Sequence, residues 1–126
     1  LATPDQKKSI AATFRTHKDK IFLKGCTRQI IGPGGWPGTE GAIGYQNGGY
    51  WGTGTGFVLP MIAAIDPEWA IELAGDLLAN LDGIKRAEWI DAQGTGKGAL
   101  EFLGTLSMPL IGLRAILEGK QTLDYL

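Results

Sequence analysis

The sequence predicts an all-α protein of antiparallel helical hairpins, in which four helices are separated by two long glycine-rich loops. Three observations support this fold class. Apolar residues recur at helical spacing in several segments. Helix-starting signals stand before two of these segments, at Thr3-Pro4 and at Asp66-Pro67. No segment between them has the pattern of a convincing strand.

The overall composition is that of one globular domain. The chain has 126 residues, of which 44% are hydrophobic and 20% charged, so it is too short for two ordinary domains and too apolar for a disordered chain. Its net charge of -1 implies no basic face. Nucleic acid and anionic membranes are therefore poor candidate partners.

Cysteine and histidine are too few for the usual metal sites. Cys26 and His17 each occur once, so we expect no internal disulfide, no zinc site and no cofactor. A reducing, cytoplasmic compartment is compatible with a single cysteine. The longest apolar run covers nine residues, 57–65, and contains Pro60, which is too short for a membrane span. We expect no signal peptide at the start of this sequence.

The first predicted helix begins at Pro4 and ends near Leu23. Thr3 is its cap and Gln6 completes a capping box. The apolar stripe holds Ile10, Ala11, Phe14, His17 and Ile21. His17 is interpreted as a residue at the boundary of this stripe.

Two helices are predicted in the middle of the chain. The first is a buried helix over 57–65, which could begin as early as Tyr50, with Pro60 in its first turn or at a kink. The second begins at Asp66-Pro67-Glu68, where an N-cap, a proline and an acid come together. Its apolar face is Ala70, Leu73, Ala74, Leu77, Leu78 and Leu81, with Glu68, Glu72 and Asp76 opposite.

The last helix is predicted from Ala99 to Glu118, with a kink at Pro109. It is apolar nearly all round, so we expect burial on more than one side.

Residues 25–56 and 84–98 are predicted to be irregular. Gly32-Pro33-Gly34-Gly35-Trp36-Pro37-Gly38 cannot be helical. Loops of this length in a compact domain are usually functional or disordered. If neighbouring helices run antiparallel, both loops emerge on the same rim, which would bring Tyr45–Thr55 near Glu88–Gly98.

The stretch from Gly44 to Gly56 combines six glycines with Tyr45, Tyr50 and Trp51, and it has no formal charge. Neutral hydrogen-bonding groups beside aromatic faces suit a hydroxyl-rich ligand such as a sugar. The alternative is structural: the aromatic residues lead into a buried helix and the glycines allow close packing.

Glu88 is the best catalytic candidate, because it lies in a loop beside Trp89, where apolar surroundings can tune a carboxylate. The competing interpretation is an ordinary solvated glutamate. Asp91, as a turn former, and Glu101, as a helix-start acid, are weaker candidates. The Gly94-Thr95-Gly96-Lys97-Gly98 run lacks Walker spacing and no strand precedes it, so we do not predict a phosphate loop.

Two loop motifs resemble a family of glycosidases. Tyr45-Gln46-Asn47-Gly48-Gly49-Tyr50-Trp51, a helix pair, Ala87-Glu88-Trp89-Ile90-Asp91 and then a glycine run and an apolar helix are similar to the C-terminal part of (α/α)6-toroid glycoside hydrolases. Trehalases, alkaline/neutral invertases, processing α-glucosidases and glycogen-debranching-type enzymes belong to this group. The chain departs from them at Ala87, often a proline, and at Gly52-Thr53-Gly54, where bulkier residues are common.

The resemblance implies an inverting hydrolase of neutral oligosaccharides or disaccharides, with Glu88 as general base. The residues that it implies for sugar binding are Gln46, Asn47, Gly48, Tyr50, Trp51, Trp89 and Glu101. A general acid is also required, and in these families it comes from the earlier half of the toroid.

The chain would then be one all-α segment, 1–126, from the C-terminal portion of a larger toroid, incomplete alone. Its partners would be a neutral sugar and either the rest of the toroid or a second copy, through exposed apolar helix faces. Two other classes remain: a non-catalytic helical module that binds carbohydrate or protein, and a structural assembly domain.

Overall fold

The computed structural model describes residues 3–31 and 44–119. Its helices are α1 (Pro4–Thr16), α2 (Lys18–Ile21), α3 (Gly52–Ala63), α4 (Pro67–Asn80) and α5 (Leu103–Glu118). Its strands are β1 (Phe22–Leu23), β2 (Cys26–Arg28), β3 (Tyr50–Trp51), β4 (Trp89–Ile90) and β5 (Gly96–Lys97). The predicted irregular run 32–38 lies outside the described residues.

The all-α prediction is wrong, because the five short strands form one antiparallel sheet in the order β1-β2-β3-β4-β5. The description of the chain as part of an all-α toroid fails with it. The strands could not be predicted from the sequence because each has only two or three residues, which is too few to show an alternating pattern of apolar and polar residues. The β3–β4 pair joins the two segments predicted to be irregular, because it brings Tyr50 opposite Ile90.

The N-terminal helix begins as predicted and ends earlier. Thr3 Oγ1 accepts from the Gln6 amide, and the Gln6 side chain accepts from the Thr3 amide, which completes the capping box. The helix is interrupted at His17, and the last predicted residues form α2 and the strand β1. β1 turns back onto β2 through Lys24 and Gly25, both at positive φ.

The two middle helices form an antiparallel-type pair joined by residues 64–66. α3 begins at Gly52, between the two starting points considered from the sequence, and contains Pro60. Asp66 caps α4, its Oδ1 accepting from the Trp69 amide. Asp66 also forms an ion pair with Arg15, whose guanidinium lies 5.5 Å from the Trp69 ring centre. These two contacts join α1 to the start of α4.

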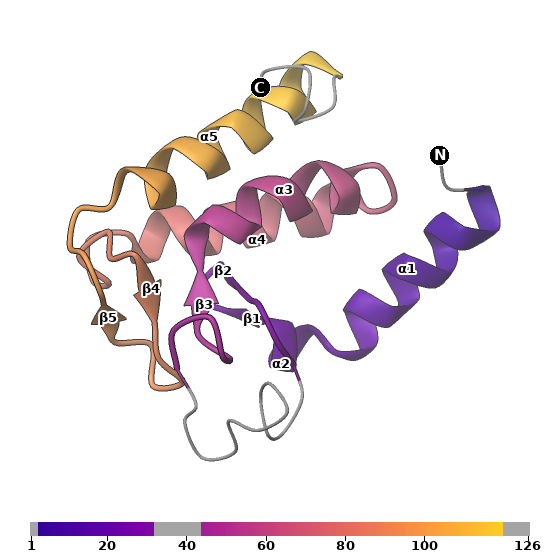
Figure 1. Ribbon diagram of the computed structural model, residues 1–126. Helices are drawn as coiled ribbons and strands as arrows, with labels where there is room; N and C mark the ends of the chain where they lie inside the picture. Colours follow the sequence, from indigo (N-terminus) through magenta and orange to yellow (C-terminus); the bar gives the residue numbers. More distant parts are fainter. Residues whose placement is uncertain (1–2, 32–43, 120–126) are drawn as a thin grey trace.

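The last helix begins at Leu103 rather than at Ala99, because Glu101 takes a positive φ of 55° and ends the preceding turn. α5 packs along α3 (Figure 1). The expectation that it is buried on several sides is wrong for part of its surface. Leu103, Leu110 and Leu117 recur every seven residues and are 73%, 58% and 86% exposed.

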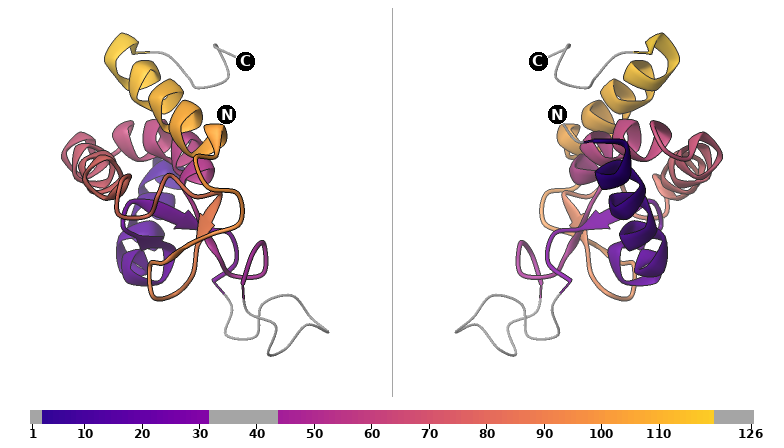
Figure 2. Two further views of the ribbon diagram at one scale, coloured as in Figure 1. Left: turned by 90° about the vertical axis from the view of Figure 1, so that its left-hand side faces the viewer. Right: turned by 90° about the vertical axis from the view of Figure 1, so that its right-hand side faces the viewer.

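The buried residues form two clusters, one where the sheet packs against α4 and one between helices. Figure 2 shows the strands below the layer of α3, α4 and α5. The sheet cluster is Cys26, Tyr50, Leu77, Ile84 and Ile90. The helical cluster is Leu59, Ile62, Ala70, Leu73 and Ala74. Leu77 of α4 belongs to the sheet cluster, so α4 links the two.

Candidate functional site

The two glycine-rich loops meet because their strands pair. β3 and β4 are antiparallel neighbours with Tyr50 opposite Ile90. This register places Trp51, at the end of β3, in the same region as Glu88 and Trp89, at the start of β4. We had expected the loops to meet through antiparallel helices; a sheet brings them together instead.

Four side chains from these loops form an aromatic–carboxylate cluster, which consists of Tyr45, Trp51, Glu88 and Trp89. The Tyr45 ring centre lies 5.1 Å from that of Trp51 and 6.1 Å from that of Trp89, both edge-to-face. The Tyr45 hydroxyl donates to Glu88 Oε1 at 3.2 Å. Tyr45 is thus the central member, and it is 48% exposed.

The Glu88 carboxylate is held at both oxygens. Oε1 accepts from Tyr45, and Oε2 accepts from the Ala99 amide at 3.1 Å. The Glu88 amide also donates to the Ala99 carbonyl at 2.8 Å. A carboxylate has about four lone-pair positions, so these two bonds orient the group and leave acceptor capacity for a ligand or a water.

The turn that carries Tyr45 is tightly defined. The amides and carbonyls of Gly44 and Asn47 exchange hydrogen bonds of 3.1 and 2.8 Å, and Tyr45 adopts a φ of 47°. The Tyr45 carbonyl accepts from the Gly49 amide at 2.8 Å and from the Trp51 indole at 3.3 Å. The ring of Tyr45 is therefore directed by its own backbone turn.

Gly49 and Gly98 leave no room for a side chain, and a Cβ on Gly49 would come closest to the Tyr45 carbonyl oxygen, at 2.3 Å. A Cβ on Gly49 would lie 2.8 Å from Trp89 Cε3, and one on Gly98 would lie 3.0 Å from Trp89 Nε1 and 2.5 Å from Glu88 Oε2. Gly98 also has a φ of +71°. Glycine here allows the backbone to approach an indole. This agrees with the structural interpretation of the glycines, for these positions.

The charge of Glu88 changes the titration of its neighbour. The Glu88 carboxylate repels a nearby phenolate and accepts the hydrogen bond of the neutral phenol, and both effects raise the pKa of Tyr45, with a smaller contribution from burial. Tyr45 therefore remains a hydrogen-bond donor to higher pH than an ordinary tyrosine.

The other predicted sugar-binding residues are divided between surface and core. Gln46 is exposed beside Tyr45, and Asn47 is half-buried in the same turn. The Gly48 carbonyl accepts from Arg28 Nε at 3.1 Å. Tyr50 is only 7% exposed, lies in the sheet cluster and has the Arg28 guanidinium over its ring at 5.6 Å.

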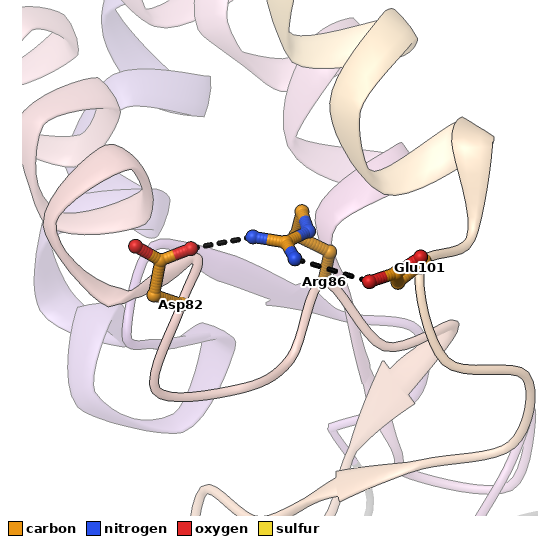
Figure 3. Close-up of polar contacts among 3 residues, drawn as sticks. All are labelled: Asp82, Arg86 and Glu101. Atoms are coloured by element: carbon orange, nitrogen blue, oxygen red, sulfur yellow. Dashed lines mark hydrogen bonds and ion pairs between the residues drawn. The ribbon is translucent and has the colours of Figure 1, made fainter.

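Asp91 and Glu101 are each engaged away from the cluster. Asp91 Oδ1 accepts from the Gln93 and Thr95 amides, and Oδ2 pairs with Lys97 Nζ at 3.3 Å, so this carboxylate builds the β4–β5 turn. Glu101 pairs with Arg86, which also pairs with Asp82 (Figure 3).

A groove of about 340 Å³ adjoins the cluster. No groove was predicted from the sequence. Its lining residues are Thr27, Arg28, Gln29, Gln46, Trp51, Thr53, Gly54 and Phe57. Tyr45 was also absent from the predicted site residues. An aromatic-rich loop was the available signal for Tyr45, whereas no local pattern connects Arg28 or Gln29 with Trp51.

Within residues 3–31 and 44–119, no group of three or more histidine, cysteine, aspartate or glutamate side chains is arranged to hold a metal ion. The helices of the same part of the chain are too short or too polar to cross a membrane. No protein-family model matches the chain, and neither a curated protein nor a solved structure shows a significant match to it.

Proposed function

We propose that the aromatic–carboxylate cluster binds a neutral sugar and that the protein is a glycoside hydrolase in which Glu88 activates water as general base. The observation that supports this most directly is the Tyr45–Glu88 hydrogen bond of 3.2 Å beside two indoles. The resemblance of the two loop motifs to glycosidase motifs gives separate support from the sequence.

The chemistry requires a carboxylate whose position is set before the substrate arrives. Tyr45 and Ala99 hold one oxygen each, which restricts rotation of the carboxylate without using all of its lone pairs. A water on the remaining lone pair would lose its proton to Glu88 as it attacks the anomeric carbon. Flat rings beside this point offer apolar surface to the carbon–hydrogen face of a sugar.

Inversion also needs a carboxylic acid on the other side of the sugar, roughly 6.5–9.5 Å from the base. Asp91 and Glu101 are held by Lys97 and Arg86 respectively. We therefore assign the general acid to a residue outside the two loops.

The decisive experiment measures sugar binding and glucose release separately. Trehalose, sucrose and maltose are offered to the protein, to Glu88→Gln and to Glu72→Gln, which alters an exposed carboxylate on α4. We expect hydrolysis of at least one disaccharide, a loss of about a hundredfold or more in kcat for Glu88→Gln, and little change in its affinity. Equal turnover by Glu88→Gln and the unaltered protein would remove Glu88 from the mechanism.

A non-catalytic carbohydrate-binding module is the second candidate, and the engagement of both Glu88 oxygens favours it. In that case the carboxylate would serve to fix the two loops. Saturable binding of a disaccharide without hydrolysis, reduced in Tyr45→Ala, would support this second function.

A further inference from the structure

We propose that the groove beside Trp51 is a second sugar subsite, so that the ligand is an oligosaccharide of at least two units. This rests on the proposed function of the aromatic–carboxylate cluster. The first unit would lie against Tyr45, Trp51 and Trp89, and the next unit would lie in the groove of about 340 Å³.

The two places are adjacent because they have Trp51 in common. Trp51 contacts Tyr45 in the cluster and also lines the groove. Gln46 lines the groove and follows Tyr45 directly in the chain. The groove therefore begins at the Trp51 indole, which is itself a member of the cluster.

The lining of the groove matches the amphipathic surface of a sugar. Phe57, on the second turn of α3, is 48% exposed although burying a phenylalanine ring away from water is favourable. It stands with Trp51 as apolar surface, and Gln29 and Gln46 bring exposed amides that donate and accept hydrogen bonds. Concave sites with apolar walls and few polar groups are typical of small-ligand sites.

Among the residues that the structure describes, Arg28 is the one charged residue lining the groove, and it is anchored. Its Nε donates to the Gly48 carbonyl at 3.1 Å, and its guanidinium covers the Tyr50 ring. An anchored guanidinium presents donors in a fixed plane. These donors suit sugar hydroxyls, and no carboxylate that could make the groove a cation site is present among the lining residues within 3–31 and 44–119.

The test compares one-unit and two-unit sugars on the same protein. Glucose is the one-unit probe, and trehalose, maltose and cellobiose are the two-unit probes, followed by tryptophan fluorescence and calorimetry. In Phe57→Ala we expect affinity for the preferred disaccharide to fall about three- to tenfold, with affinity for glucose unchanged. Phe57→Trp should restore disaccharide binding, and Ile71→Ala, which alters an exposed apolar side chain on α4, should change neither.

The outcomes separate this inference from the function on which it rests. If Tyr45→Ala weakens both glucose and disaccharide binding while Phe57→Ala weakens neither, the groove is no subsite and the cluster still binds sugar. If the unaltered protein binds none of these probes, both proposals are overturned. If Phe57→Ala weakens glucose and disaccharide equally, the groove is part of a single-unit site and the two-unit inference fails.

Discussion

The Tyr45 hydroxyl and Glu88 Oε1 lie 3.2 Å apart although 43 positions separate the two residues in the chain. This contact joins the turn before β3 to the loop that enters β4. The pair therefore adds a side-chain link between the two glycine-rich segments to the backbone pairing of β3 with β4.

The first prediction concerns the pKa of Tyr45. Because the carboxylate of Glu88 raises it, Glu88→Gln should bring the pKa of Tyr45 back toward its ordinary value, while Glu72→Gln should not. Phenolate absorbance, or the ring carbon shift of Tyr45, measures this during a pH titration. Identical titrations of Tyr45 in Glu88→Gln and the unaltered protein would contradict the hydrogen bond.

The sign of the stability effect follows from the same shift. The folded-state pKa of Tyr45 lies above the unfolded value, so its contribution is fully present below the unfolded pKa. It is lost as the pH rises through the folded pKa. The difference in unfolding free energy between the unaltered protein and Tyr45→Phe should therefore shrink on the alkaline side.

The second prediction concerns the reactivity of Cys26. Burial raises the pKa of the Cys26 thiol to about 12, and the charge of Lys24 opposes this only weakly. Near pH 8 its thiolate fraction is then about a thousandfold lower than that of an ordinary thiol. A disulfide reagent should react slowly with the native protein and rapidly in denaturant; rapid native reaction would show that the thiol is accessible.

The third prediction compares two glycines inside helices. A Cβ on Gly56 would collide with the Met108 backbone of α5, whereas one on Gly75 of α4 would meet nothing within 4 Å. Gly56→Ala should therefore destabilise the fold by about 1–3 kcal/mol. Gly75→Ala should stabilise it by about 0.5–1 kcal/mol, because alanine restricts the unfolded chain. Urea unfolding measures both, and a shift of the same sign in the two variants would contradict the close α3–α5 contact.

The fourth prediction concerns acid and the β4–β5 turn. The hydrogen bond from the Thr95 amide is the largest influence on the pKa of Asp91 and lowers it. Burial is the next largest and raises it, and Lys97 and the Gln93 amide lower it further, so the pKa is lowered overall. A lowered folded-state pKa means that this contribution is present above the unfolded pKa and is lost as the pH falls through the folded one. In Asp91→Asn the unfolding free energy should fall less steeply as the pH is lowered. The same loss of unfolding free energy at low pH in Asp91→Asn and in the unaltered protein would contradict the role of Asp91 in this turn.

Much of the helical structure was visible in the sequence because its signals are local. The capping box of Thr3 and Gln6 and the Asp66 cap are both formed. The start of α5 was predicted four residues too early, since nothing local announces the positive φ of Glu101. The predicted apolar face of α4 includes Leu78, which is 52% exposed, because the helix is covered on only part of its surface.

The sequence alone determined where α1 and α4 begin and that two aromatic, glycine-rich segments lie between the helices, since caps and helical periodicity depend on residues a few positions apart. Only the tertiary structure decided that these segments form a sheet, that Tyr50 enters the core while Tyr45 stays at the surface, and that Phe57 lines a groove beside Trp51. These outcomes depend on pairing Tyr50 with Ile90 across 40 positions, and strands of two residues carry no local signal for such a partner.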